Sequence, residues 1–371
     1  MNPFNYGIIV KGDNFYNRKE ECERIVSTLS NGNNLVLFAP RRYGKTSLVF
    51  RAMEQMESKG ITCIYFDFMP VYSIETFVSS YIHSLEKKQT NLQKLSQIIS
   101  TVVKNVRPKL TFDINGNPEF GIDLLENKVT FQTLSEVLDL PEKLVLKGQK
   151  IVVIFDEFQE ITKFDKIGFE NLLRSKVQLQ NVNYLFLGSR THLLIEMFTN
   201  KKRAFYNSAS HLQLNSLPQE DTIIFLQKKF SDSNITIDRQ TAQCIIQESG
   251  DIPYYIQMLA AEIWQYMITS QTIVTEDIVK FCANKIIVLK QDYYFELFDR
   301  QSVMQKQLLK ALVISGENVF SAEYAKRFRL SASSTTQKAI IVLMDSGIID
   351  RTLNTYFISD PFFNRFILNY A

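Results

Sequence analysis

Four short apolar runs, interspersed with stretches that have helical spacing, constrain the fold of this chain more than any other feature. The runs occupy residues 34–39, 61–68, 150–158 and 182–189. Continuous rather than alternating hydrophobicity is typical of strands that are buried on both faces. The repeated order of strand and helix therefore predicts an α/β fold, in which helices cover both faces of a parallel sheet.

Other stretches carry apolar residues at helical spacing, with charges at the remaining positions. They predict helices at residues 17–29, 45–60, 74–104 and 131–147. Residues 109–123 have a different pattern, in which two alternating segments flank Asn115, Gly116 and Asn117. Because Asn-Gly is a strong signal for a tight turn between two strands, we expect a β-hairpin insertion here.

The second half of the chain changes character. After Pro218 we expect no further strand of the sheet, and residues 218–290 are predicted to form several helices. From about residue 294, three predicted helices precede a short hairpin at 347–359, an order typical of a winged helix. We therefore expect an α/β domain carrying the hairpin, a helical lid and a C-terminal winged helix, at residues 1–215, 216–292 and 293–371.

Length and charge limit the class of protein. At 371 residues the chain exceeds one ordinary core, which agrees with several domains. A net charge of +3 gives no overall field that attracts nucleic acid or an anionic membrane, although a local basic patch stays open. No apolar run reaches the roughly 18 residues of a membrane span. The N-terminus also lacks the apolar run of a signal peptide.

The four cysteines are far apart and form no C-x-x-C pair. Such cysteines are typical of a reducing compartment, where they act as small core residues. We therefore expect a cytoplasmic protein. The three histidines, His83, His192 and His211, are widely separated, which argues against a histidine-based metal site.

Residues 35–49, LVLFAPRRYGKTSLV, place Gly-Lys-Thr between a predicted strand and a predicted helix. This is the context of the phosphate-binding loop G-x-x-x-x-G-K-[ST], which the segment resembles. Amides of residues 42–46 and the helix start would hold a β-phosphate. Lys45 would bridge the β- and γ-phosphates, and Thr46 would bind Mg²⁺. The candidate nucleotide-binding residues of the loop are Pro40, Arg41, Arg42, Tyr43, Gly44, Lys45, Thr46 and Ser47.

The loop departs from the pattern at Ala39, where the first glycine is expected. One methyl group is tolerable there if φ stays negative. Pro40 supplies no N–H, but the phosphate site relies mainly on the later residues. Gly44 is present where the backbone must approach a phosphate closely. The alternative, a chance Gly-Lys-Thr at a helix start, must be weighed against the rest of the chain.

Acidic residues end the third predicted strand, which is followed by Asp156 and Glu157. In open α/β sheets, ligands bind beyond the carboxyl ends of the strands. Asp156 is therefore the candidate Mg²⁺ ligand and Glu157 the residue that polarises the attacking water. The alternative is a solvated helix start, which the helix dipole favours. Together with the upstream loop, the pair favours the functional interpretation.

Ser189 follows the fourth predicted strand directly after Gly188. A small polar side chain at this place can contact the γ-phosphate or the attacking water, which makes Ser189 a candidate catalytic sensor. An ordinary polar strand end is the alternative interpretation.

Five segments taken in order, FAPRRYGKTSL, VVIFDEFQEI, LFLGSRTHLL, RAFYN and SGDIPYYIQ, resemble the archaeal-type ATPase family. That family belongs with the signal-transduction (STAND) and replication-initiator-like AAA+ ATPases. The resemblance implies a P-loop NTPase fold, ATP and Mg²⁺ as cofactors, and ATP hydrolysis.

Further site residues follow from the resemblance alone. Residues 13–21 resemble the N-terminal box of the family, which implies that Phe15 and Arg18 lie beside the adenine. Gly250 and Pro253 match two positions of the lid that closes over the nucleotide. The family usually has one residue between these positions, whereas this chain has two, so the match is approximate.

An arginine that contacts the γ-phosphate is implied by the resemblance and is either Arg190 or Arg203. The segment that contains Arg203 departs from the family pattern Pro-Phe-Tyr-Gly, because Ala204 and Asn207 replace the proline and the glycine. For both arginines, a surface ion pair is the alternative.

The leading functional interpretation is a slow ATPase that acts as a nucleotide-driven switch with a protein partner. The second is an ATP-regulated DNA-binding protein that uses the winged helix. Lys326, Arg327 and Arg329 precede its second predicted helix, which offers Lys338 as a cation. The start of that helix also offers the hydroxyls of Ser331, Ser333, Ser334, Thr335 and Thr336.

Two other nucleotide enzymes fit the sequence less well. A GTPase is disfavoured because the guanine-type motif at residues 162–165 follows the acidic pair too closely. A nucleotide kinase would need an arginine-rich acceptor pocket, and we identify none in the sequence.

Overall fold

The computed structural model describes residues 2–10, 12, 15–86, 92–112, 118–124, 129–144, 150–268, 273–331, 333–352 and 355–370. The chain divides into two compact units. Unit 1 comprises Met1–Arg18, Pro40–Ser47 and Asn215–Ala371, and unit 2 comprises Lys19–Ala39 and Leu48–Leu214. Each unit is described by itself below.

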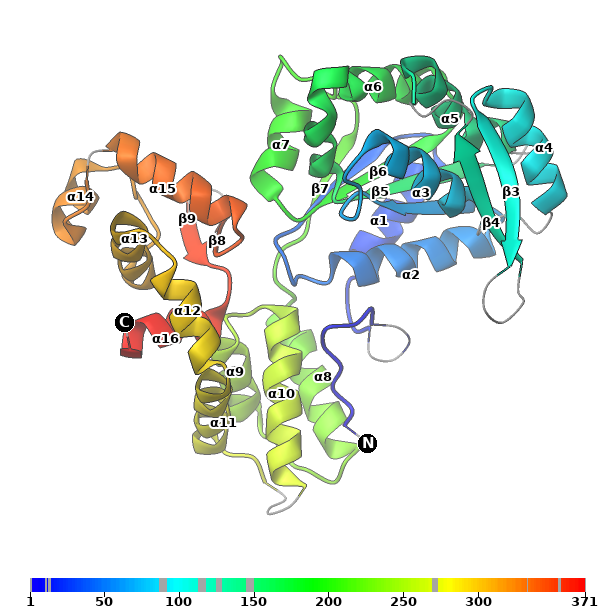
Figure 1. The fold of residues 1–371 in the computed structure, drawn as a ribbon. Coiled ribbons are helices and arrows are strands. Elements are labelled where there is room, and N and C mark those ends of the chain that lie inside the picture. Colours follow the sequence, from blue (N-terminus) through cyan, green and yellow to red (C-terminus); the bar gives the residue numbers. More distant parts are fainter. Residues whose placement is uncertain are drawn as a thin grey trace. The chain divides into compact units, whose positions relative to one another are not determined.

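Unit 2 contains a five-stranded sheet in which all strands are parallel (Figure 1). The spatial order is β2-β5-β6-β1-β7. The four apolar runs form β1, β2, β5 and β6, which confirms the predicted parallel sheet. The strands are β1 (Leu35–Phe38), β2 (Thr62–Asp67), β5 (Ile151–Asp156), β6 (Asn183–Gly188) and β7 (Ser210–Gln213).

Strand β7 was not predicted from the sequence. Its residues, Ser-His-Leu-Gln, contain only one buried side chain, that of Leu212. The strand lies at the edge of the sheet and pairs only with β1, where Phe38 is in register with Gln213. An edge strand has one partner and little buried surface, so it lacks the apolar run that reveals the central strands.

Helices cover both faces of this sheet (Figure 1). On one face, strand residues such as Phe66, Phe155 and Phe186 join one aromatic-rich core with helices α3, α4, α5, α6 and α7. The alternate strand residues are also buried, and α1 packs against β1 and β6. The helices of unit 2 are α1 (Lys19–Ser30), α2 (Lys45–Ser58, of which the first three residues belong to unit 1), α3 (Ile74–Glu86), α4 (Leu92–Val102), α5 (Phe131–Leu144), α6 (Phe169–Leu179) and α7 (Thr191–Thr199).

Two details of unit 2 refine the predictions. The helical region expected at 74–104 forms two helices, α3 and α4. The expected hairpin is confirmed as β3 (Val106–Phe112) paired antiparallel with β4 (Pro118–Leu124). Its turn at Asn115, Gly116 and Asn117 lies outside the described residues.

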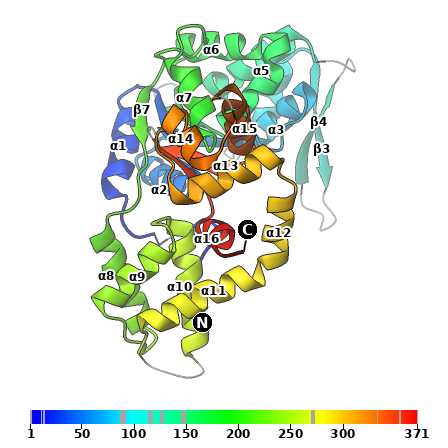
Figure 2. The same cartoon turned by 90° about the vertical axis from the view of Figure 1, so that its left-hand side faces the viewer.

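Unit 1 contains the helices that follow the sheet (Figure 2). As predicted, this region is almost entirely helical. It begins with α8 (Gln219–Ser231), α9 (Arg239–Glu248), α10 (Pro253–Met267) and α11 (Glu276–Leu289). Pro253 occupies the first turn of α10, where its missing N–H leaves no hydrogen bond broken.

The C-terminal part of unit 1 has the predicted winged-helix order, with helices followed by an antiparallel hairpin. It also has a final helix that the sequence analysis did not predict. The elements are α12 (Gln291–Asp299), α13 (Val303–Ile314), α14 (Ala322–Phe328), α15 (Ser333–Asp345), β8 (Ile349–Thr352), β9 (Thr355–Ile358) and α16 (Pro361–Tyr370). Helix α16 buries Phe362, Phe363 and Phe366 and packs against α11, α12 and α13.

Within the part of the chain that the structure describes, no helix combines the length and the apolar character that crossing a membrane requires.

Candidate nucleotide-binding site

The loop that carries Gly-Lys-Thr belongs to unit 1. Ala39, just before it, does not adopt a positive φ, so the condition for tolerating its methyl group is met. Arg42 and Gly44 both have left-handed backbones, with φ of 72° and 81°. An added Cβ at Gly44 would meet no atom within 4 Å, so glycine is required there by conformation rather than by space. Helix α2 starts at Lys45, which is 7% exposed.

Arg42 connects the loop to helices α10 and α16 of unit 1. Its carbonyl oxygen accepts a hydrogen bond from the backbone N–H of Tyr254, at 3.3 Å. Its guanidinium lies over the rings of Tyr254 and Tyr255, 5.0 and 4.7 Å from their centroids. The Nη1 atom is also 3.6 Å from Asp360 Oδ2. The side chain of Arg42 is therefore held between the start of α10 and the start of α16.

Asp360, which pairs with Arg42, also contacts two other elements of unit 1. Its Oδ1 atom accepts the backbone N–H of Phe362 at 2.9 Å, which caps the first turn of α16. Its Oδ2 atom accepts the hydroxyl of Tyr294 at 3.2 Å. Burial lowers the pKa of the neighbouring Lys290, an effect that Asp360 opposes. The carboxylate thus joins α12, α16 and the loop.

Arg41 reaches the winged helix. A Cβ added at Gly347 would lie 2.6 Å from Arg41 Nη1, so the guanidinium occupies the space that a side chain would fill. Gly347 follows α15 and precedes β8. Nearby, burial raises the pKa of Asp350 to about 6, while Arg41 and Arg351 lower it. Arg42 therefore forms an ion pair with a carboxylate of the C-terminal elements, and the charge of Arg41 acts on a second one.

Most of the N-terminal box belongs to unit 1, which extends to Arg18, while residues 19–21 begin unit 2. Asp13 and Asn14 of the box are outside the described residues. Arg18 is buried, and its Nη2 atom donates to the carbonyl of Asn215 at 2.5 Å. The ring of Tyr16 stacks on Phe225 of α8, with centroids 3.9 Å apart. Phe15 is only partly buried, and its backbone N–H donates to the carbonyl of Gly12.

A polar group near the loop was missed by the sequence analysis. Ser216 forms side-chain hydrogen bonds with Tyr43 and with Asp251, and burial raises the pKa of both of these groups. Asp251 has a left-handed backbone, with φ of 57°, and its Oδ1 atom is buried without a hydrogen-bond partner among the described residues. Asp251 is one of the two residues between Gly250 and Pro253. The departure from the family spacing at this place could therefore have pointed to Asp251 from the sequence.

Gly250 and Ser47 also have defined neighbours in unit 1. A Cβ at Gly250 would lie 3.1 Å from Cβ of Pro361, so the turn between α9 and α10 approaches the start of α16 closely there. Ser47 Oγ accepts the backbone N–H of Val10 at 3.0 Å.

The two acids belong to unit 2. Asp156 ends β5 and is 5% exposed. Its Oδ2 atom accepts the hydroxyl of Tyr65 at 2.7 Å, and its Oδ1 atom accepts the backbone N–H of Glu157 at 2.8 Å. Burial and the adjacent Asp156 carboxylate raise the pKa of Tyr65, so the phenol stays a donor. These contacts hold Asp156 as an acceptor at the end of the strand.

Glu157 adopts a left-handed backbone, with φ of 50° and ψ of 42°. The 3₁₀ segment η2 (Phe158–Ile167) follows it. Oε2 of Glu157 accepts the hydroxyl and the backbone N–H of Ser189, at 2.8 and 3.2 Å, and the amide of Gln159 at 2.6 Å. The structure therefore brings Asp156, Glu157 and Ser189 together at one edge of the sheet.

Strand β1 ends at this same edge. Phe38 is in register with Gly188 of β6, and Phe186 is in register with Phe155 of β5. All three strands run in the same direction, so the chain leaves β1 for the loop at the edge that carries the acids. This is the arrangement that the sequence predicted from the positions of the motifs.

Both arginine candidates are paired with acids in unit 2. Arg190 directly follows Ser189, and its Nη1 atom is 3.8 Å from Glu160 Oε1. Arg203 Nη2 donates to Glu170 Oε2 at 2.5 Å, and its Nη1 atom is 3.9 Å from Asp165. Burial raises the pKa of Glu170, which Arg203 opposes.

One residue of the predicted DNA-contacting helix was assigned wrongly. Thr336 is 2% exposed, and its hydroxyl donates to the carbonyl of Ser331 rather than facing solvent. The first residues of α15 are otherwise exposed, as are Lys326, Arg327 and Arg329 before it.

The parallel sheet, the Gly-Lys-Thr loop between β1 and α2, and the acids after β5 define a P-loop NTPase. Residues 15–259 match a family described as an ATPase domain predominantly from Archaea. The chain belongs to this archaeal ATPase family, which confirms the resemblance found in the sequence. Residues 292–369 match a family described as a probable winged helix domain.

Two solved structures share the fold over nearly the whole chain. A Walker-type ATPase of Pyrococcus abyssi is 18% identical, with a TM-score of 0.65 and 99% of each chain covered. The ORC2 protein of Aeropyrum pernix, solved as ADPNP and ADP complexes, is 13% identical with a TM-score of 0.57. That match covers 99% of this chain and 95% of the other. No curated protein sequence matches the chain.

Proposed function

We propose that the protein binds ATP with Mg²⁺ and hydrolyses it, and that the nucleotide acts as a switch. The observation that carries the proposal is the sheet edge at which β1 leads into the Gly-Lys-Thr loop and β5 ends in Asp156 and Glu157. Membership of an ATPase family supports the same reaction. The ADPNP and ADP complexes of the Aeropyrum protein support an adenine nucleotide.

In this proposal the loop holds the phosphates. Backbone amides of residues 42–46 and the start of α2 face the β-phosphate. Lys45 contributes its charge to the β- and γ-phosphates. The nucleotide also contacts Phe15 and Arg18 of the N-terminal box and Pro253 of α10. The remaining loop residues, Pro40, Arg41, Arg42, Tyr43 and Ser47, shape the loop around it.

The residues fit a Mg²⁺ ion. Mg²⁺ in NTPases is held by one or two protein oxygens and by the substrate phosphates. Asp156 is a buried carboxylate whose two oxygens each accept a hydrogen bond, so the side chain is held in place at the end of β5. Thr46 supplies a hydroxyl at the start of α2. The bound ion would neutralise charge on the β- and γ-phosphates.

Glu157 is the proposed general base, because it follows the metal-binding acid at the carboxyl edge of the sheet. Ser189 holds the Glu157 carboxylate through two hydrogen bonds and is the proposed sensor. For the arginine that contacts the γ-phosphate we propose Arg190, which follows Ser189 at the same edge. Arg203 instead bonds Glu170 of α6, which supports a structural role for it.

The switch is supported by the contacts of the loop inside unit 1. Arg42 meets Asp360 and Arg41 meets the turn before β8, so a change in the loop reaches the winged helix directly. We therefore propose that residues 1–215 form the ATPase domain, 216–292 a lid and 293–371 a winged helix that responds to the nucleotide. Turnover is expected to be slow, with a protein partner as the trigger.

DNA binding through the winged helix is the alternative, supported by the winged-helix match. The exposed face of α15 includes Thr335, Lys338, Ile341 and Val342. One cation and two apolar side chains are a poor match for phosphates, which favours a protein partner. We expect no mobility shift of duplex DNA that weakens steeply with salt, and such a shift would support the alternative.

Hydrolysis by three forms of the protein tests the proposal. Lys45→Ala should weaken ATP binding about tenfold or more, because it removes a charge that faces the phosphates. Glu157→Gln should bind ATP like the wild type but lower kcat by about 100-fold or more. Measuring the Kd of ADPNP and the steady-state rate separates the two effects. Normal turnover by Glu157→Gln would show that another group is the base.

A further inference from the structure

Gln159 is the buried partner of the proposed base. It lies in η2, two residues after Glu157, and is 1% exposed. Its Nε2 atom donates to Glu157 Oε2 at 2.6 Å. The orientation of the amide follows from its partner, because the opposite orientation would place a carbonyl oxygen against a carboxylate.

Among the described residues, this contact is one of three hydrogen bonds to the same carboxylate oxygen. Glu157 Oε2 also accepts the hydroxyl and the backbone N–H of Ser189. Charge-assisted hydrogen bonds of this kind are stronger than neutral ones. Ser189, which directly follows β6, provides both of these donors, whereas Gln159 holds the carboxylate from its own segment.

The end of β6 is shaped around the same amide. A Cβ added at Gly188 would lie only 2.2 Å from Gln159 Oε1. That oxygen is buried and has no hydrogen-bond partner among the described residues. An unsatisfied buried carbonyl costs free energy, and the hydrogen bond from Nε2 to Glu157 offsets that cost. Gly188 is the residue that leaves room for it.

We infer that Gln159 is a positioning residue, which fixes the Glu157 carboxylate for its task, and that Gly188 admits Gln159 to that place. The inference rests on the proposed function, because it takes Glu157 as the general base. Gln159 contacts the proposed base directly. Its loss should therefore lower the rate of hydrolysis without weakening nucleotide binding.

Two variants test the contact between Gln159 and Glu157 in different ways. Gln159→Met keeps the length of the side chain but removes the donor. Gly188→Ala leaves Gln159 intact and displaces the end of its flexible side chain. Each should lower kcat by about tenfold. The Kd of ADPNP should stay within about twofold of wild type, since the proposed phosphate contacts come from residues 42–46, which neither variant changes.

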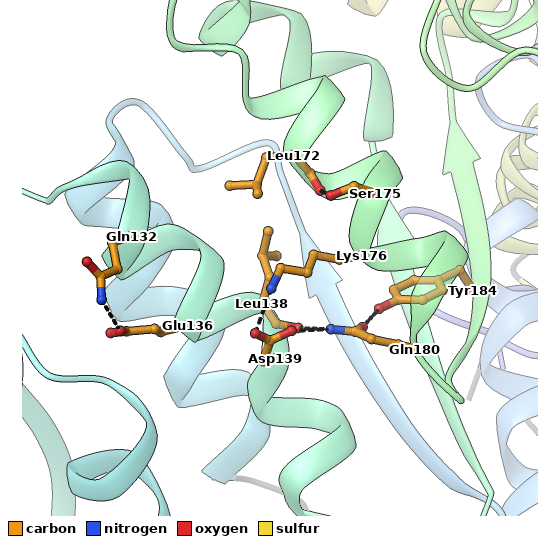
Figure 3. Close-up of polar contacts among 9 residues, drawn as sticks. All are labelled: Gln132, Glu136, Leu138, Asp139, Leu172, Ser175, Lys176, Gln180 and Tyr184. Atoms are coloured by element: carbon orange, nitrogen blue, oxygen red, sulfur yellow. Dashed lines mark hydrogen bonds and ion pairs between the residues drawn. The ribbon is translucent and has the colours of Figure 1, made fainter.

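Gln180→Met is the matched control in the same unit (Figure 3). Gln180 also sits in a polar network, where it donates to Asp139 Oδ1 at 2.8 Å and accepts the hydroxyl of Tyr184 at 2.6 Å. It precedes β6, whereas Gly188 ends that strand. The control should lower the midpoint of thermal unfolding while leaving kcat unchanged.

A double-mutant cycle distinguishes positioning from a general effect on the fold. Gln159→Met should slow single-turnover hydrolysis in the wild-type background but have no further effect in a Glu157→Gln background. An equal effect in both backgrounds, or a Gln159→Met rate equal to wild type, would overturn the inference and leave the proposed function standing. A Glu157→Gln protein that hydrolyses ATP like the wild type would instead overturn both.

Discussion

At the scale of single residues, the candidate site is marked by left-handed backbone. Arg42, Gly44, Glu157 and Asp251 all have positive φ. For residues other than glycine, this conformation costs about 1 kcal/mol or more and persists only where the surroundings impose it. Each of the four lies in or next to a segment that carries a sequence motif. The left-handed backbone at these residues therefore occurs where the motifs predict the site.

Gly44→Ala tests the conformational requirement in the loop. No atom lies within 4 Å of the added Cβ, so the substitution acts through φ alone. We expect the Kd of ADPNP to rise about tenfold or more, because the amides that follow would change direction. Gly32→Ala is the control, since Gly32 has φ of 86° and equally open space in the turn before β1. Equal binding by both variants and the wild type would contradict the role of Gly44.

Asp350 gives a prediction for pH. Burial raises its folded-state pKa to about 6, above the ordinary value of 3.8. A raised carboxyl pKa contributes stability that is complete below pH 3.8 and is lost as the pH rises through about 6. Asp350→Asn removes this titration. Relative to wild type, the variant should therefore gain ~1 kcal/mol in free energy of unfolding between pH 5 and pH 7.5. Urea unfolding at both pH values measures this, and a pH-independent difference would contradict it.

Many of the contacts around the site could not be predicted from the sequence. The loop, Asp156, Glu157 and Ser189 could be predicted, because a motif places each at the carboxyl end of a strand. The partners of Arg42, which are Asp360 and Tyr255, could not. They lie hundreds of positions along the chain, and only the packing of helices brings them to the loop.

At the scale of elements, the apolar runs and the helical periodicity identified the central strands and most helices. Strand β7 was missed because an edge strand needs no apolar run. Segment η2 was missed because a 3₁₀ segment has a different period from an α-helix. Helix α16 follows a hairpin so closely that its aromatic residues gave no separate signal.

The start of α16 is where the loop and the winged helix meet in unit 1. Asp360→Asn keeps an oxygen that can cap Phe362 but removes the charge facing Arg42. The loss of stability should be small, about 0.5 kcal/mol, because the Arg42 side chain is 41% exposed. We expect ADPNP to change hydrogen exchange in α16 of the wild type and to have much less effect in the variant.

The control for that experiment is Asp299→Asn, which removes an exposed ion pair with Lys306 in the same unit. Its response to ADPNP should match that of the wild type. An Asp360→Asn protein that responds to ADPNP as the wild type does would contradict a path from Arg42 to α16.

At the scale of the whole molecule, the chain passes between the two units four times, at residues 18–19, 39–40, 47–48 and 214–215. The phosphate loop belongs by its contacts to unit 1, while the strand before it and most of the helix after it belong to unit 2. In our proposal, this loop holds the phosphates. Hydrolysis would change the contacts that the loop makes inside unit 1, which is what a nucleotide-driven switch requires.

The measurement that tests this account most directly is a crystal structure with ADPNP and Mg²⁺. We predict the triphosphate on the amides of residues 42–46, with Lys45 at its β- and γ-phosphates. We predict the Mg²⁺ ion between Thr46 and Asp156. A nucleotide bound elsewhere, or a triphosphate on the loop with Asp156 turned away from the ion, would contradict the central claim.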